Sequence, residues 1–157
     1  MRVLCFTALF VLIACSPTAD KGYLYGKAKV VDGDTLRVAG ADIRLFGIDT
    51  PELHQLCTKR GKEWPCGEAA KARMVTLTEG KMVRCDTKGR DSLYRRPVAV
   101  CWAGNTELNR VIASEGLAVI DERYPSEYQK EQAAARKAKR GVWAGDFESP
   151  KDWRHQH

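Results

Sequence analysis

The sequence lacks several features that would place it in a specialised class of protein. The apolar stretch at residues 3–14 has twelve residues, fewer than the roughly 20 that a membrane-spanning helix needs. No internal repeat or low-complexity tract is visible, and the hydrophobic share of 44% argues against a disordered chain. The cysteines lack the paired CxxC spacing of a zinc site. The three histidines, His54, His155 and His157, have no partner at metal-ligand spacing.

A chain of 157 residues is enough for one domain with a single core. The formal net charge of +6 fits a polyanionic partner such as nucleic acid or an anionic membrane, or it only aids solubility. The cations at 136–140 are typical of a solvated helix end, where they suit the helix dipole.

The start of the chain resembles an export signal. Residues 1–14 combine a short positive beginning with an apolar stretch, as in a signal peptide. The segment 12–15 resembles a bacterial lipobox, in which cleavage before Cys15 leaves that cysteine lipidated; the alternative is an ordinary secretory signal cut a few residues later. Both predict an extracytoplasmic protein, either membrane-anchored or secreted. Residues 15–22 are then a polar tether, and residues 23–154 form the folded domain.

The cysteines agree with an oxidising compartment. The sequence has six cysteines. Cys5 would leave with the signal and Cys15 would be lipidated, so four remain, an even number that suits disulfide pairing. Four cysteines allow three connectivities, and the sequence does not choose among them. Local geometry favours pairing Cys57 with Cys66 and Cys85 with Cys101.

From Tyr23 onwards the pattern indicates β-structure followed by alternating helices and strands. Strands are predicted at 23–31, 35–38, 42–48, 81–87 and 97–102. Residues 49–66 contain two prolines and two cysteines and are predicted to be a long functional loop. Helices are predicted at about 68–79, at about 107–115 with Thr106 as cap, and after a capping box of Ser126 and Gln129, ending at Gly141.

Two acidic turns stand out: Asp32-Gly33-Asp34-Thr35, and Asp49-Thr50-Pro51-Glu52. Each alone is typical of turn chemistry, with Gly33 supplying a special backbone conformation. One hairpin separates them, so both can lie at the same end of the sheet. Clustered carboxylates repel one another unless a cation is present, and oxygen ligands suit calcium or magnesium. Arg44, between the two turns, suits bidentate phosphate binding.

Together these motifs resemble the staphylococcal-nuclease (thermonuclease) family. The resemblance rests on VVDGDTLRV…IRLFGIDTPE, on YRRPVAVCW and LNRVIASEGLAV, and on the late GVWAGDFESPKDWR, and covers about 23–154. It implies a five-stranded OB-type β-barrel with three α-helices, an α+β fold. It also implies calcium-dependent cleavage of DNA and RNA at the 5′ P–O bond, leaving 3′-phosphates. We expect the protein to act as a monomer.

The resemblance also implies roles for individual residues. Asp34 and Asp49 match the carboxylates that bind Ca²⁺, and Thr50 matches the position that gives a backbone carbonyl to the metal. Glu52 matches the general base, and Arg44 matches the first phosphate-binding arginine.

The second phosphate-binding arginine belongs to a Tyr-Gly-Arg motif, which here reads Tyr94-Arg95-Arg96. Arg96 is therefore the match, although the loop is one residue longer than usual and Arg95 could take the role. Tyr94 and Tyr124 either stack on a base or pack in the fold. At 121–122 two acids stand where the family often has an aromatic residue; they either repel phosphate or face solvent.

Three functions compete on this basis. The first is an active nuclease. The second is a non-catalytic OB module that binds single-stranded nucleic acid, and the third is a surface lipoprotein that binds calcium or a partner without turnover. Loss of the base or of an arginine would favour the second, and all of them are present.

Overall fold

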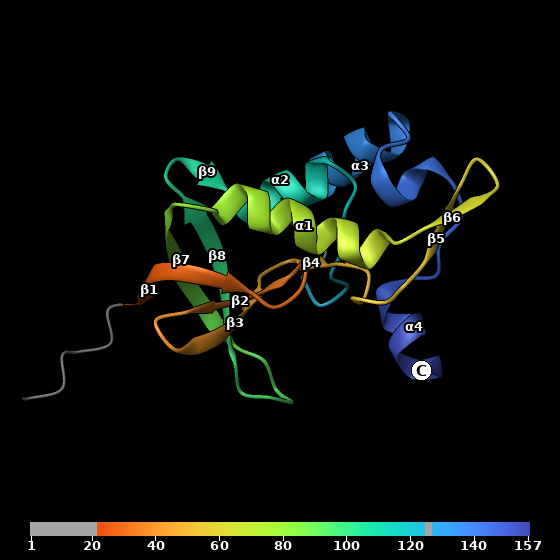
Figure 1. The fold of residues 1–157 in the computed structure, drawn as a ribbon. Helices are drawn as coiled ribbons and strands as arrows, with labels where there is room; N and C mark the ends of the chain where they lie inside the picture. The colour runs from red at the N-terminus through yellow and green to blue at the C-terminus, as the bar shows by residue number, and fades with distance from the viewer. Residues whose placement is uncertain (1–21, 125–126) are drawn as a thin grey trace, which may run out of the picture.

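The computed structural model describes residues 22–124 and 127–157, and its centre is a closed β-barrel (Figure 1). The barrel strands are β1 (Tyr23–Val30), β2 (Thr35–Val38), β3 (Ala41–Leu45), β7 (Met82–Arg90) and β8 (Pro97–Ala103). Neighbours pair antiparallel in the order β3-β2-β1-β7-β8, and a parallel pairing of β3 with β8 closes the ring. Closure leaves no free edge among these strands. The predicted five-stranded OB-type barrel is confirmed.

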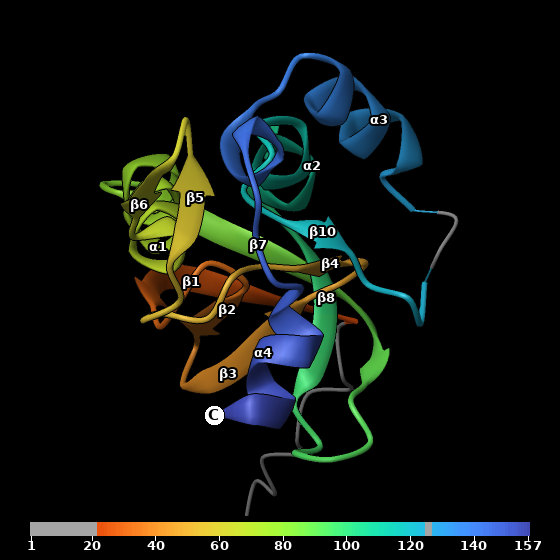
Figure 2. The same cartoon turned by 90° about the vertical axis from the view of Figure 1, so that its right-hand side faces the viewer.

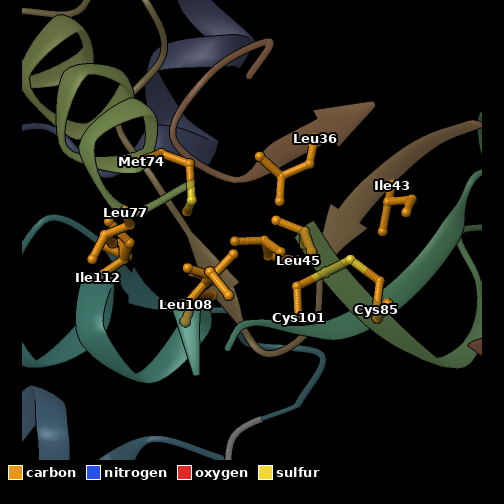
Figure 3. Close-up of a cluster of buried hydrophobic side chains, with 14 of the residues drawn as sticks. Leu36, Ile43, Leu45, Met74, Leu77, Cys85, Cys101, Leu108 and Ile112 are labelled. Atoms are coloured by element: carbon orange, nitrogen blue, oxygen red, sulfur yellow. A yellow bond between two sulfur atoms is a disulfide. The ribbon is translucent and has the colours of Figure 1, made fainter. Parts of the chain in front are cut away.

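The barrel interior is filled by the alternate residues of its strands. Leu36 and Val38 of β2 are both fully buried, as the alternation in the sequence predicts. Figure 3 shows the leucines and isoleucine of β2 and β3 facing side chains of α1 (Cys66–Thr78) and α2 (Leu108–Ser114). The disulfide Cys85–Cys101 joins β7 to β8 within this core. The helices therefore close one side of the barrel.

The helices differ in number and in detail from the prediction. α1 and α2 lie within two residues of the predicted positions, but Glu107, not Thr106, precedes α2, and its side chain makes no capping bond. α3 (Gln129–Lys137) ends before Gly141, which begins a short 3₁₀ helix, η1 (Gly141–Ala144). Ser126 of the predicted capping box lies outside the described residues.

A further helix, α4 (Pro150–Gln156), was not predicted. It follows the last segment of irregular chain and lies at the same end of the molecule as the β5–β6 hairpin (Figure 1). Figure 2 shows it on the near side of the barrel, apart from α2 and α3. The predicted count of three helices is therefore corrected to four α-helices in the described part of the chain.

The predicted long loop 49–66 contains regular structure. β5 (Cys57–Lys59) and β6 (Lys62–Trp64) form a hairpin, and the disulfide Cys57–Cys66 ties its base to α1. Three short strands complete the fold: β4 (Ile48–Asp49) pairs with β10 (Val119–Ile120), and β9 (Thr106–Glu107) pairs with β8. Both disulfides favoured from the sequence are present.

The predicted signal peptide, Cys15 and the rest of the predicted tether up to residue 21 lie outside the described residues. In the part of the chain that is described, no helix is long and apolar enough to cross a membrane.

Candidate active site

A cavity of about 520 Å³ collects most of the residues that the sequence singles out. Its wall is formed by the two acidic turns, the loop between β7 and β8, the segment that follows β10, and α4. Asp34, Arg44, Asp49, Thr50, Glu52, Tyr94 and Arg96 all line it. The two acidic turns therefore do lie at the same end of the barrel.

The pairing of β2 with β3 brings Asp34 to Arg44. Thr35 is opposite Arg44 in the register, and the Leu45 N–H donates to the Asp34 carbonyl at 2.8 Å. The Arg44 guanidinium then reaches the Asp34 carboxylate, with Nη1 3.2 Å from Oδ1. Both side chains are largely buried, so this ion pair is shielded from solvent.

The same guanidinium binds the second acidic turn. Nη2 of Arg44 lies 2.6 Å from Oδ1 of Asp49, which β4 holds against β10 opposite Val119. The Thr50 N–H donates to Oδ2 of Asp34 at 2.9 Å and ties the turns to each other directly. One cationic group therefore bridges two carboxylates that are far apart in the sequence.

Burial raises the pKa of Asp34 to about 6, although Arg44 opposes that rise. The carboxylates of Asp32 and Asp49 raise the pKa further by repulsion, and the Thr50 N–H lowers it. The negative charge on Asp34 is therefore only partly compensated by the protein, which is the condition in which a bound cation stabilises a carboxylate most.

Two glycines let the backbone approach closely around the carboxylates. Gly33 is not among the glycines with a positive φ. A Cβ there would lie 2.7 Å from the Thr50 hydroxyl oxygen and 2.8 Å from the Ala70 Cβ, so the close approach requires glycine at this position. A Cβ on Gly67 of α1 would lie 1.8 Å from the Glu52 carbonyl oxygen. Because these glycines have no side chains, Thr50 and the Glu52 carbonyl can lie this close to the backbone of the neighbouring elements.

Buried Gln55 fixes the loop that carries Glu52. Its Oε1 accepts from the Glu52 N–H at 3.1 Å, and its Nε2 donates to the Glu148 carbonyl at 2.7 Å. Glu52 itself stays partly exposed at the cavity wall.

The β7–β8 loop brings Arg96 to the cavity wall. Asp91 accepts from the Tyr94 N–H at 2.6 Å and from Nε of Arg96 at 2.9 Å. Burial raises the pKa of Asp91, but these bonds outweigh it, and the net pKa is lowered. The Arg96 guanidinium also lies 4.9 Å from the centre of the Tyr94 ring, which is 68% exposed. The parallel pairing of Arg44 with Val98 brings the two arginine-bearing segments together.

Arg95 does not line the cavity. Its φ is 57°, a left-handed conformation that favours glycine, which accounts for the glycine that the family usually has there. The geometry thus favours Arg96 over Arg95 as the cavity arginine.

Tyr124 is not among the residues that line the cavity. Its ring packs on Phe46 with 4.3 Å between ring centroids, which favours the packing alternative. Nor do the two acids at 121–122 oppose phosphate with free charge. Asp121 is buried against Arg123 at 2.6 Å, and Glu122 pairs with Lys151 at 2.7 Å.

Sequence reasoning missed Arg154 of α4. Its guanidinium lies 2.8 Å from Oδ2 of Asp49 and 2.7 Å from Oε1 of Glu52. The signal for this helix is in the sequence: Ser149 caps it by accepting from the Asp152 N–H, and Pro150 begins it. A prediction of α4 would have drawn attention to the arginine it carries.

The residues present fit a hard cation with an open coordination sphere. Within residues 22–124 and 127–157, no group of three or more carboxylate, histidine or cysteine side chains is placed to hold a metal ion. Asp34 and Asp49, however, already share one cation, Arg44, and Thr50 lies beside them. Two carboxylates and a backbone carbonyl, completed by water, are an oxygen donor set that calcium accepts.

The protein is thus an OB-type barrel with one cavity that holds carboxylates and arginines, groups suited to contact a phosphate ester. Comparison with known proteins makes this specific. A family model described as "Staphylococcal nuclease homologue" matches residues 42–145, and the chain belongs to that family.

Three relatives illustrate the range of the family. The chain is 36% identical over 140 residues to "Succinoglycan biosynthesis protein ExoI" of Rhizobium meliloti (strain 1021), covering 85% of this chain and 73% of that protein. It is 31% identical over 139 residues to "Thermonuclease" of Staphylococcus intermedius, covering 82% and 80%. It is 27% identical over 152 residues to "Probable endonuclease lcl3" of Botryotinia fuckeliana (strain B05.10), covering 87% of this chain but only 56% of that protein. Two of these three relatives are named as nucleases, and together with the family they support a nuclease.

Proposed function

We propose that this protein is a calcium-dependent nuclease that hydrolyses the phosphodiester bonds of DNA and RNA. The observation that carries the proposal is the bridge formed by Arg44 between Asp34 and Asp49, in a cavity whose walls also hold Glu52 and Arg96. Binding of a divalent cation, activation of water and neutralisation of phosphate each have a candidate residue there.

In the proposed reaction Glu52 takes a proton from the attacking water, which adds to phosphorus. The bond to the 5′ oxygen breaks, and that oxygen takes up a proton, which leaves a 3′-phosphate and a 5′-hydroxyl. Arg44 and Arg96 bind the phosphate oxygens and stabilise the charge that develops on them. Calcium held by Asp34, Asp49 and the Thr50 carbonyl would supply further positive charge.

The test is digestion of single-stranded DNA and of RNA in calcium and in excess chelator. We expect cleavage only with calcium, and products with 3′-phosphates. Glu52→Gln keeps the size of the side chain but removes the base, and should lower kcat by roughly 10²–10⁴-fold. Glu63→Gln, in the β5–β6 hairpin away from the cavity, is the matched control and should leave kcat unchanged. Full activity in chelator would contradict the calcium mechanism.

We also propose that the protein is exported and is held to a membrane by a lipid on Cys15. Support comes from the sequence of residues 1–15 and from the two disulfides, which persist in oxidising compartments. Cys15→Ser should move the protein from the membrane fraction to the soluble exported fraction. A wild-type protein that is already soluble outside the cytoplasm would favour the ordinary secretory signal.

A further inference from the structure

The C-terminal helix inserts a second arginine among the candidate catalytic carboxylates. Arg154 contacts Asp49 through both terminal nitrogens, with Nη1 3.0 Å from Oδ1 and Nη2 2.8 Å from Oδ2. Nη1 also donates to Oε1 of Glu52 at 2.7 Å. A single side chain thus engages both the proposed metal ligand and the proposed base.

Contacts of the chain just before Arg154 hold the start of α4 in place. The segment before α4 is held by Gln55 through the Glu148 carbonyl, and Pro150 at the first turn is buried. Lys151 pairs with Glu122 across the cavity at 2.7 Å. Because the helix is anchored independently, Arg154 does not need its own ion pairs to reach the site.

The charges in the site explain why a second cation is useful. Asp34, Asp49 and Glu52 carry three negative charges when ionised, and Arg44 balances only one of them. Arg154 provides the next positive charge. Its contacts, however, use both carboxylate oxygens of Asp49, and a divalent cation bound by Asp49 would need at least one of them.

We propose that Arg154 is a resident counterion that releases Asp49 when the cation binds and stays on Glu52 as a positioning residue. This inference rests on the proposed function, both for the role of Glu52 and for the cation site at Asp49. The competition predicts that Arg154 weakens cation binding. The positioning contact predicts that the same arginine raises turnover.

The experiment compares wild type with Arg154→Ala and Arg154→Lys in the full chain. Calcium binding is measured by titration calorimetry without nucleic acid, and kcat and KM are measured separately on single-stranded DNA. We expect Arg154→Ala to bind calcium about tenfold more tightly, within the usual range of coupling between neighbouring sites. Its kcat should fall about 10–100-fold because Glu52 loses its orientation, with little change in KM. Arg154→Lys keeps the charge and should restore the wild-type calcium affinity, but only part of kcat.

Lys151→Ala separates a local role from loss of the helix, because it removes the other ion pair of α4 and leaves Arg154 in place. It should leave calcium affinity unchanged. If Lys151→Ala and Arg154→Ala change calcium affinity and kcat equally, Arg154 is only a structural anchor and the proposal is overturned. Unchanged or weaker calcium binding by Arg154→Ala would also overturn it. If wild type cleaves no nucleic acid, the proposed function fails, whereas tighter calcium binding by Arg154→Ala would still support the counterion.

Discussion

At the scale of single residues, the two neighbouring arginines of the β7–β8 loop should differ sharply in function. Arg96→Ala removes a guanidinium from the cavity wall and should lower kcat/KM by at least about tenfold, since it deletes a charge-assisted phosphate contact. Arg95→Ala changes a residue outside the wall and should leave kcat/KM within about twofold. Steady-state kinetics on a short oligonucleotide checks both. The opposite ranking would mean that the loop presents Arg95 to the substrate.

The buried carboxylate of Asp34 should titrate far from its ordinary range in metal-free protein. Its folded-state pKa is raised from 3.8 to about 6, so ionised Asp34 opposes folding above about pH 6. This cost, about 3 kcal/mol for a shift of roughly two pKa units, shrinks as the pH falls and is absent below 3.8. Carbon-detected NMR of the side-chain carboxyl in chelator should give a midpoint near 6. The same signal should be missing from Asp34→Asn, and a midpoint near 4 would contradict the raised pKa.

At the scale of elements, the start of α1 supports the loop that carries Glu52. Gly67→Ala would place a methyl group 1.8 Å from the Glu52 carbonyl oxygen, so the loop or the helix must move. We expect a fall in kcat of about tenfold or more together with a lower melting temperature. Gly61→Ala is the control: its φ of +71° strains an alanine, but nothing lies within 4 Å of the new Cβ. It should lower the melting temperature while kcat stays unchanged.

Elements with strong local signals could be predicted from the sequence, and those that depend on distant partners could not. The alternation of Leu36 and Val38 predicted β2, and Gly80 marked the end of α1. β4 and β10 have two residues each and exist because Ile48 and Asp49 meet Ile120 and Val119. No local pattern encodes that meeting.

In the candidate site, too, residues placed by a local hairpin could be predicted, and residues placed by distant partners could not. The pairing of Asp34 with Arg44 follows from one hairpin, because the register of β2 with β3 sets their distance. Tyr124 was considered for stacking because an exposed tyrosine and one packed on Phe46 look alike in a sequence. Arg154 was missed because its partners, Asp49 and Glu52, lie about a hundred residues earlier.

At the scale of the whole molecule, the two disulfides should contribute comparably to stability but differently to activity. In the chain-entropy model, loops of 16 and 9 residues correspond to about 3 kcal/mol and slightly less. Cys85→Ala with Cys101→Ala should therefore lower the free energy of unfolding by about 3 kcal/mol with kcat retained under folding conditions. Cys57→Ala with Cys66→Ala should also lower kcat, because this pair ties the β5–β6 hairpin to α1 beside Gln55.

Urea denaturation measures the free energy of unfolding of each double variant, and steady-state kinetics measures its kcat. Mass spectrometry of the exported protein should find the four cysteines oxidised. Four free thiols in that material would contradict the export proposal.

The position of α4 after all the other elements has a consequence for how the protein is made. Synthesis proceeds from the N-terminus, and early segments emerge first. Asp34, Asp49 and Glu52 therefore leave the ribosome while β8, the strand that closes the barrel on β3, has yet to be translated. Arg96 follows, and Arg154 arrives later still. A nascent chain therefore exposes the acidic groups and Arg44 before Arg96 and Arg154 are available, so under the proposed function the pair of phosphate-binding arginines is completed only after β8 has begun to be made.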